Sequence, residues 1–119
     1  MKVSRGDVVL LDFPFSDATN SKVRPAVVVQ SDSHNRRMAS TVVALVTKTV
    51  LRAHREATQF LIEVDSPAGK AAGLRFDSAV ICTNLYTVHE DFVRYRIGRL
   101  PESLAPTLDG CLKAALGIV

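Results

Sequence analysis

The first two thirds of the chain carry short apolar runs separated by polar segments, a pattern typical of strands and turns. β-Branched and other apolar residues gather in most of these runs. The predicted strands are Val8–Phe13, Pro25–Gln30, Thr41–Thr47, Phe60–Val64, Ala79–Cys82 and Arg94–Gly98. Polar and apolar residues alternate in the last one, so we expect it at an exposed edge of the sheet. Pro25 is expected to be the first residue of its strand, where the missing N–H removes no hydrogen bond between strands.

Polar segments connect these strands. Residues 14–22 are rich in Pro, Ser, Asp and Asn and show no periodicity, so they are predicted to form a loop. Asp32 or Ser33 is predicted to cap a short helical turn that ends near Met38. The segment from Lys48 to Glu56 shows no clear pattern.

The end of the chain predicts a helix, because its apolar residues recur at helical spacing. Ser103 is the expected N-cap, Pro106 fits the first turn, and Gly117 is the expected stop. The predicted apolar face comprises Leu104, Leu108, Cys111, Leu112, Ala115 and Leu116. Five or six short strands followed by one amphipathic helix predict a mainly β fold, a curled antiparallel sheet or small barrel with the helix packed on it.

Length and composition predict a single folded domain over residues 1–119. The chain is 47% hydrophobic and 23% charged, so it can bury a core without a metal or a disulfide framework. Its two cysteines, Cys82 and Cys111, have no metal-ligand spacing and suit a reducing cytoplasm. The longest apolar runs are too short to span a membrane, and Asp7 interrupts any signal-peptide core. We therefore expect a cytoplasmic protein without a membrane partner.

The charge is basic and uneven. The formal net charge is +3, and residues 1–60 hold nine Lys/Arg against five Asp/Glu. Such an excess in one half is compatible with a polyanionic partner such as nucleic acid, although many small basic domains bind none.

Several kinds of chemistry have no sequence signal. The six glycines are scattered and form no phosphate-binding loop, and no His, Asp or Glu cluster has metal-ligand spacing. We therefore expect no metal and no cofactor. Tryptophan is absent and aromatics make up 6%, which argues against the base-stacking platform of the usual single-strand binders.

Two strand ends carry the first candidate residues. Arg24 follows a polar loop and precedes Pro25, so its guanidinium suits bidentate binding of a phosphate. Thr47, Lys48 and Thr49 place hydroxyl, ammonium and hydroxyl groups in succession beyond an apolar strand, which suits an oxyanion. The alternatives are a surface ion pair at Arg24 and ordinary strand-end polarity at Thr47.

Asp77, Ser78 and the histidines each allow a functional and a structural interpretation. Asp77 and Ser78 can contact a ribose or a base edge, or Asp77 can simply cap a turn. The three histidines raise the hypothesis of a nuclease that uses histidine as acid and base; they are His34, His54 and His89. All three fall in predicted loops or turns, and nothing in the sequence pairs them.

Taken together, these segments resemble the MazF/PemK family of toxins. The resemblance runs in order from residue 5 to 117. It is carried by Arg5-Gly6-Asp7, Arg24-Pro25-Ala-Val-Val, the strand that ends at Thr47, Gly73-Leu74, Asp77-Ser78, Leu85-Tyr-Thr87, Arg96-Ile97-Gly98 and the closing helix Leu112–Gly117. It implies a small SH3-like β-barrel of the MazF/CcdB type with a C-terminal amphipathic helix, usually as a homodimer.

The resemblance also implies an activity. The family cleaves single-stranded RNA at specific sequences without a metal, and a paired antitoxin restrains it. The family's shared functional pair maps onto Arg24 and Thr47, with further RNA contacts expected at Lys22, Asn35, Lys48, Asp77 and Ser78. RNA supplies its own nucleophile, the ribose 2′-hydroxyl, so the protein need only orient it, move protons and stabilise the anionic phosphorane.

This sequence departs from the family pattern at two places. The fifth strand reads Ile81-Cys82-Thr83 where some members carry an Arg-x-Asp pair. The loop before Arg24 carries Asp17, Thr19, Asn20 and Lys22 where other members carry His or Glu. Two alternative functions remain: a non-enzymatic CcdB-like toxin acting on DNA gyrase, and an inactive nucleic-acid-binding regulator.

Overall fold

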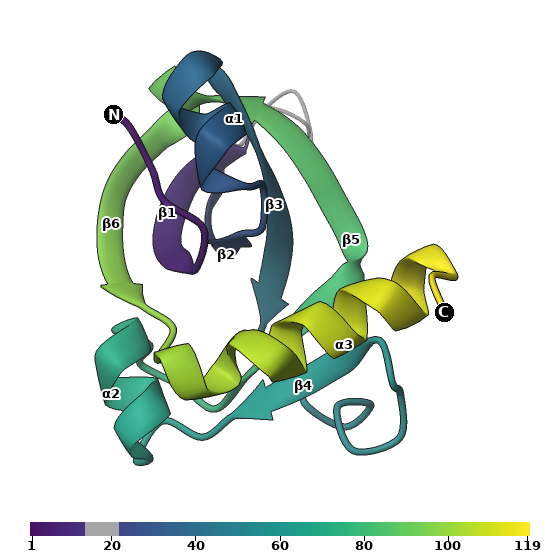
Figure 1. Ribbon diagram of the computed structural model, residues 1–119. Helices are drawn as coiled ribbons and strands as arrows, with labels where there is room; N and C mark the ends of the chain where they lie inside the picture. The colour runs from purple at the N-terminus through teal and green to yellow at the C-terminus, as the bar shows by residue number, and fades with distance from the viewer. Residues whose placement is uncertain (14–21) are drawn as a thin grey trace.

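Six strands form one curved antiparallel sheet in the computed structural model, which describes residues 1–13 and 22–119 and, of residues 13 and 22, only the backbone (Figure 1). The strands are β1 (Asp7–Phe13), β2 (Lys22–Val28), β3 (Ser40–Thr47), β4 (Gln59–Ile62), β5 (Ser78–His89) and β6 (Val93–Arg99). Their order across the sheet is β4-β5-β3-β2-β1-β6. The end strands β4 and β6 do not pair with each other within the described residues, so the sheet curls without closing into a barrel.

All six predicted strands are present, and β6 lies at an edge as expected. The start of the second strand was predicted wrongly, because β2 begins at Lys22 and Pro25 lies in its interior. β5 has 12 residues, far more than the four predicted. Its register against β3 shifts between Ala44 and Leu45, which pair with Leu85 and Ile81, so the polar residues Thr83 and Asn84 fall at this irregularity. These two residues interrupt the apolar pattern, so the sequence did not predict the second half of the strand.

Three α-helices and two 3₁₀ turns complete the fold: α1 (Asp32–Arg37), α2 (Pro67–Ala72), α3 (Ala105–Leu116), η1 (Glu90–Phe92) and η2 (Glu102–Leu104). The C-terminal helix is confirmed, and Gly117 ends it in the left-handed conformation. Ser103 is not its cap, because it lies within η2 and α3 starts without a side-chain cap. At α1 the cap is Ser31, not Asp32 or Ser33. α2 was not predicted, although Ser66 caps it.

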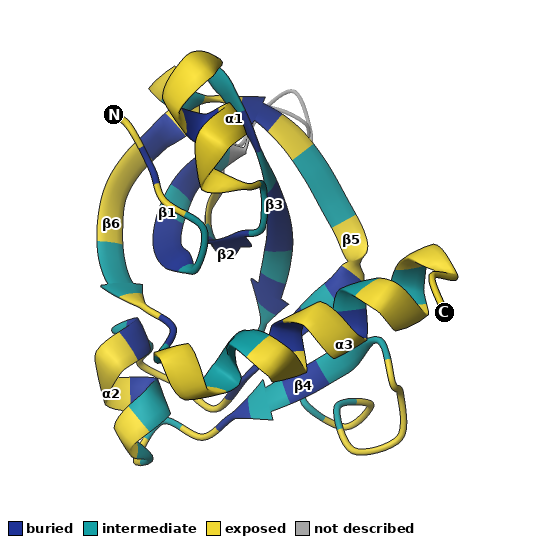
Figure 2. Ribbon diagram, viewed as in Figure 1, coloured by how far each residue is buried: buried dark blue, intermediate teal, exposed yellow. Residues whose placement is uncertain are grey.

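The central strands β1, β2 and β3 bury residues on both faces, which explains why their apolar runs are continuous, whereas β6 is largely exposed (Figure 2). Along β1, Val8 belongs to a core cluster that α3 covers through Leu108 and Cys111. The next residue, Val9, belongs to a second cluster on the opposite face, together with Val93. Neighbouring residues of one strand therefore both serve as core.

Two glycines allow α2 to pack directly on β6. Gly73 ends α2 with φ of +71°, and a Cβ there would collide with the carbonyl oxygen of Ile97. A Cβ on Gly98 would collide with backbone atoms of Ala71 and Ala72. This close approach fixes the position from which the chain continues through residues 74–78 toward β5.

Candidate active site

A cleft opens where β2 and β3 stop pairing. Their last paired residues on this side are Ala26 and Leu45. Pro25 has no N–H with which to extend a ladder, and β3 continues beside β5 through Thr47. Continuing the β2–β3 register by two residues would set Arg24 opposite Thr47. The opening between the two strand ends is lined by both residues.

The cleft has a volume of about 610 Å³ and is cationic. Three of its lining side chains are basic, namely Arg24, Lys48 and Arg75, and none of those described is acidic. The remaining lining residues are Leu10, Val23, Pro25, Val46, Thr47, Gly73, Leu74, Phe76, Ser78 and Ile97. A phosphodiester backbone fits this combination of concentrated positive charge and apolar surface.

Arg24 and Thr47 are both free to bind a ligand. Arg24 is exposed, and the described part of the chain offers its guanidinium no hydrogen bond or ion pair. The Thr47 hydroxyl oxygen accepts the backbone N–H of Thr49 at 3.2 Å. That bond orients the hydroxyl and leaves its proton available for donation to an anion in the cleft.

The other predicted contact residues divide by position. Lys48 and Ser78 line the cleft. The Ser78 side chain is 3% exposed and donates to the carbonyl of Phe76 at 2.7 Å, so its proton is already used. Asp77 does not line the cleft, and its Oδ1 accepts the backbone N–H of Val64 at 2.8 Å. Asp77 thus supports the segment that forms one wall.

Asn35 does not line the described cleft. Asn35 lies on α1 and is 3% exposed; its amide accepts the Thr41 hydroxyl at 2.7 Å and donates to the carbonyl of Gln30 at 3.0 Å. Thr41 stands near the start of β3, away from Thr47 at its end. We therefore revise the prediction for Asn35 to a structural role. The side chain of Lys22, and the loop residues Asp17, Thr19 and Asn20, lie outside the described residues.

Two lining residues were missed by sequence reasoning. Arg75 and Phe76 are both exposed and line the cleft between α2 and β5. The Lys48 ammonium lies 4.7 Å from the centroid of the Phe76 ring, a cation–π contact between two residues that line the cleft. The only available signal was their position immediately before Asp77 and Ser78.

Histidine and cysteine chemistry finds no support in the described cleft. His34, His54 and His89 are exposed and none of them lines it. Burial, with the neighbouring Cys111 thiol second, raises the pKa of Cys82 to about 12, and burial also raises the pKa of Cys111. Both thiols therefore stay protonated near neutral pH and do not act as nucleophiles.

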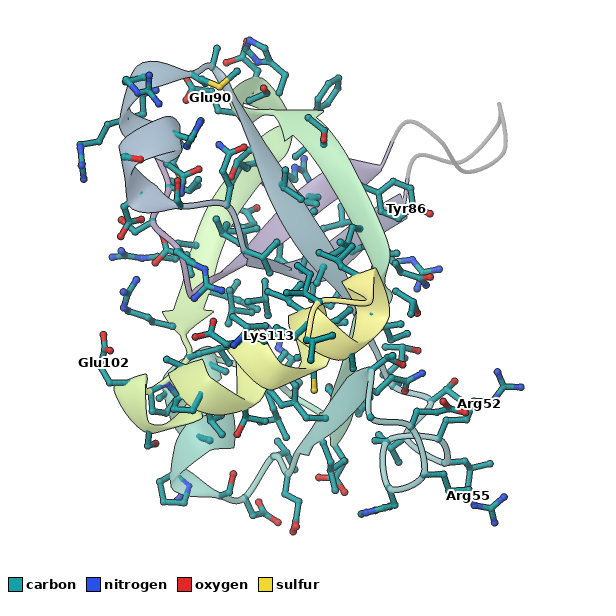
Figure 3. All side chains as sticks on the ribbon, turned by 45° about the vertical axis from the view of Figure 1, so that its right-hand side comes forward. Arg52, Arg55, Tyr86, Glu90, Glu102 and Lys113 are labelled. Atoms are coloured by element: carbon teal, nitrogen blue, oxygen red, sulfur yellow. The ribbon has the colours of Figure 1, made fainter. Side chains whose placement is uncertain are left out.

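Basic side chains continue beyond the cleft into the loop that follows β3. Arg52 and Arg55 point away from the fold into solvent (Figure 3). Charges placed this way raise the local concentration of a polyanion without fixing its position. Within the described part of the chain, no helix combines the length and apolar character needed to cross a bilayer.

Comparison with known sequences decides the family. Residues 4–116 match the family described as PemK-like, MazF-like toxin of type II toxin–antitoxin system. The chain belongs to this family. Among MazF-like relatives, the endoribonuclease MazF6 of Mycobacterium tuberculosis (strain H37Rv) is 31% identical over 120 residues, covering 99% of this chain and all of the relative. The endoribonuclease EndoA of Bacillus subtilis (strain 168) is 27% identical, covering 100% and 98%.

Solved structures of MazF-like proteins share the fold. One, described as an endoribonuclease in complex with its cognate antitoxin from a mycobacterial species, matches with a TM-score of 0.77 at 20% identity, covering 98% of this chain and 97% of that one. The M. tuberculosis toxin MazF-mt6 matches with a TM-score of 0.75 at 21% identity, covering 95% and 98%. The antiparallel sheet with its C-terminal helix is thus a MazF-like fold.

The motifs shared with the MazF/PemK family have different structural roles. Asp7 is 2% exposed, accepts the backbone N–H of Ser4 at 2.8 Å and pairs with Arg99 at 2.9 Å, so it ties β1 to β6. Arg24 and Thr47 instead face the open cleft. Asp7 therefore stabilises the fold, whereas Arg24 and Thr47 are available to bind and act on a substrate.

Proposed function

We propose that this MazF-like chain is an endoribonuclease toxin that cleaves single-stranded RNA in the cytoplasm and acts as one domain over residues 1–119. The observation that carries the proposal is the meeting of Arg24 and Thr47 in a cationic cleft with no acidic lining residue among those described. The family match over residues 4–116 and the relatives named as endoribonucleases support it.

The proposed reaction is attack by a ribose 2′-hydroxyl on the adjacent phosphorus. A bond forms between the 2′-oxygen and phosphorus, and the bond from phosphorus to the 5′-oxygen breaks. The products are a 2′,3′-cyclic phosphate and a 5′-hydroxyl. The attacking 2′-oxygen loses a proton, and the departing 5′-oxygen gains one. Arg24 holds the non-bridging oxygens as negative charge grows on them, and Thr47 donates a hydrogen bond to one of them.

The partners proposed are an RNA strand and a cognate antitoxin. One structural neighbour is described as a complex with its cognate antitoxin, which supports the second partner. A homodimer stays a prediction, supported by the open edge of β6 and the exposed side chains of Leu116 and Ile118, and a light-scattering mass tests it.

Cleavage is expected to need no divalent ion, because the RNA brings its own nucleophile and Arg24 supplies the positive charge. Incubating the purified protein with a long single-stranded RNA in EDTA should give discrete cuts whose downstream fragments carry 5′-hydroxyl ends. The Arg24→Ala variant, purified in the same way, controls for contaminating nucleases.

Three outcomes would contradict this proposal. Cleavage that disappears in EDTA and returns with Mg²⁺ would show a metal-dependent reaction. Intact RNA together with gyrase-dependent DNA breaks would instead support the CcdB-like alternative, which the endoribonuclease relatives do not favour. RNA binding with neither result would support an inactive regulator.

Replacing Thr47 is expected to weaken cleavage moderately. Thr47→Ala should lower the rate about ten-fold, because one neutral hydrogen bond to the developing anion is lost. Thr47→Ser keeps the hydroxyl and should retain most activity. Thr87→Ala, an exposed threonine on β5 outside the cleft, is the control for threonine loss in rate measurements on one RNA. Equal rates for Thr47→Ala and Thr87→Ala would remove Thr47 from the site.

A further inference from the structure

The cleft has an apolar wall as well as its cations. Phe76 is 56% exposed and Val23 is 40% exposed, and both line the opening that holds Arg24. Single exposed apolar residues are common on protein surfaces and need no explanation. An exposed phenyl ring inside a cationic cleft differs, because a nucleotide presents both a phosphate and a flat aromatic base.

The segment that carries Phe76 is held at several points. The backbone N–H of Leu74 donates to the carbonyl of Gly69 at 3.3 Å as α2 ends. The carboxylate of Asp77 accepts the Val64 N–H, and the Ser78 hydroxyl donates to the carbonyl of Phe76 itself. A ring mounted on a backbone held in this way loses little conformational freedom when a ligand packs against it.

Lys48 connects the ring to the phosphate-binding side of the cleft. Its ammonium lies 4.7 Å from the Phe76 ring centroid, and it directly follows Thr47 in the chain. A base that packs on the exposed part of the ring therefore lies beside a cation and near the proposed catalytic pair. Every nucleobase has a π-face, so stacking here tolerates different bases.

We propose that Phe76, with Lys48 beside it, forms a stacking subsite for a nucleobase that flanks the scissile phosphate. This inference rests on the proposed RNA cleavage and adds to it a residue that positions the substrate. The low aromatic content of the chain argues against a row of stacking rings, but one ring placed in the cleft is sufficient for one base.

The test uses a short oligonucleotide built around a mapped cut site. Cuts in a long RNA are first located with the wild-type protein, and a DNA strand is then made with one ribonucleotide on the 5′ side of the scissile phosphate. Single abasic positions are introduced on either side of the cut. The quantities compared are kcat and KM for the wild type and for Phe76→Ala.

The wild type is expected to lose about ten-fold in kcat/KM at one abasic position, the size typical of one lost stacking contact. Phe76→Ala should lose about as much on the intact strand, mainly through a higher KM, and should lose nothing further at that same position. Phe76→Leu, which keeps an apolar side chain without a π-face, should behave like Phe76→Ala. Phe76→Tyr should retain the wild-type pattern.

The control is Phe92→Ala, which removes an exposed ring from η1, outside the cleft. It should leave both constants unchanged. If Phe76→Ala and Phe76→Leu keep the wild-type KM, or lose as much as the wild type at every abasic position, the stacking subsite is wrong although RNA cleavage stands. If the wild type cuts no RNA at all, the proposed function itself fails and the subsite falls with it.

Discussion

Replacing Arg24 with alanine is expected to lower RNA cleavage by at least about a hundred-fold, because the cleft loses a transition-state charge contact of about 3 kcal/mol. Arg24 is exposed and has no partner within the described residues, so the fold should not depend on it. Circular dichroism and the thermal midpoint should match those of the wild type, while initial rates on one RNA fall.

Arg24→Lys separates charge from geometry. A lysine keeps the positive charge but lacks the planar fork that grips two phosphate oxygens, so it should recover little activity. Arg36→Ala is the matched control, because it removes the same charge from an exposed position on α1, outside the cleft. It should cleave nearly as well as the wild type.

One result would assign catalysis to a histidine instead of Arg24. If Arg24→Ala cleaves normally while alanine at His34, His54 or His89 abolishes cleavage in a folded protein, the catalytic group is an imidazole. The assignment of Arg24 and Thr47 would then be wrong.

Gly98→Ala is expected to be strongly destabilising although it adds only one methyl group. The added Cβ meets backbone atoms of Ala71 and Ala72, and a backbone cannot move aside as a flexible side chain can. Overpacking of this kind costs about 1–3 kcal/mol or more, which lowers the thermal midpoint by several degrees. Because α2 leads into the wall that holds Phe76, cleavage should fall as well.

Gly110→Ala is the matched control for this change. Gly110 lies inside α3, and a Cβ there meets no atom within 4 Å. Alanine in an open helix interior should raise the free energy of unfolding by about 0.5–1 kcal/mol. Denaturant unfolding of the two variants measures both effects. Equal stability of Gly98→Ala and the wild type would contradict the close packing of α2 on β6.

The strands were predictable because their signal is local. Apolar and β-branched runs determined six strands, and helical spacing determined α3, with errors confined mostly to ends and caps. α2 escaped prediction because six residues with three alanines and a glycine show no amphipathic pattern. The strand pattern left a curled sheet and a small barrel both open, and the structure has the curled sheet, because the number of strands does not determine whether the end strands meet.

The site was predictable in part. Arg24 and Thr47 were singled out by residue type, strand-end position and family resemblance, and they line one cleft. Asn35 was misjudged because an amide in a polar turn looks the same in sequence whether it faces solvent or, as here, bonds to Thr41 and Gln30. Arg75 and Phe76 were missed because neither belongs to a motif.

The sequence by itself determined the strands, the C-terminal helix, the family and the two residues proposed for chemistry, since each depends on neighbours along the chain. The tertiary structure alone decided that Arg24, Thr47 and Phe76 line one opening. Those three residues are far apart in the chain and meet because β2 and β3 stop pairing at Ala26 and Leu45, and because two glycines let α2 approach β6. Strand pairing and the contact of α2 with β6 each join residues that are distant in sequence, so no local pattern of residues predicts them.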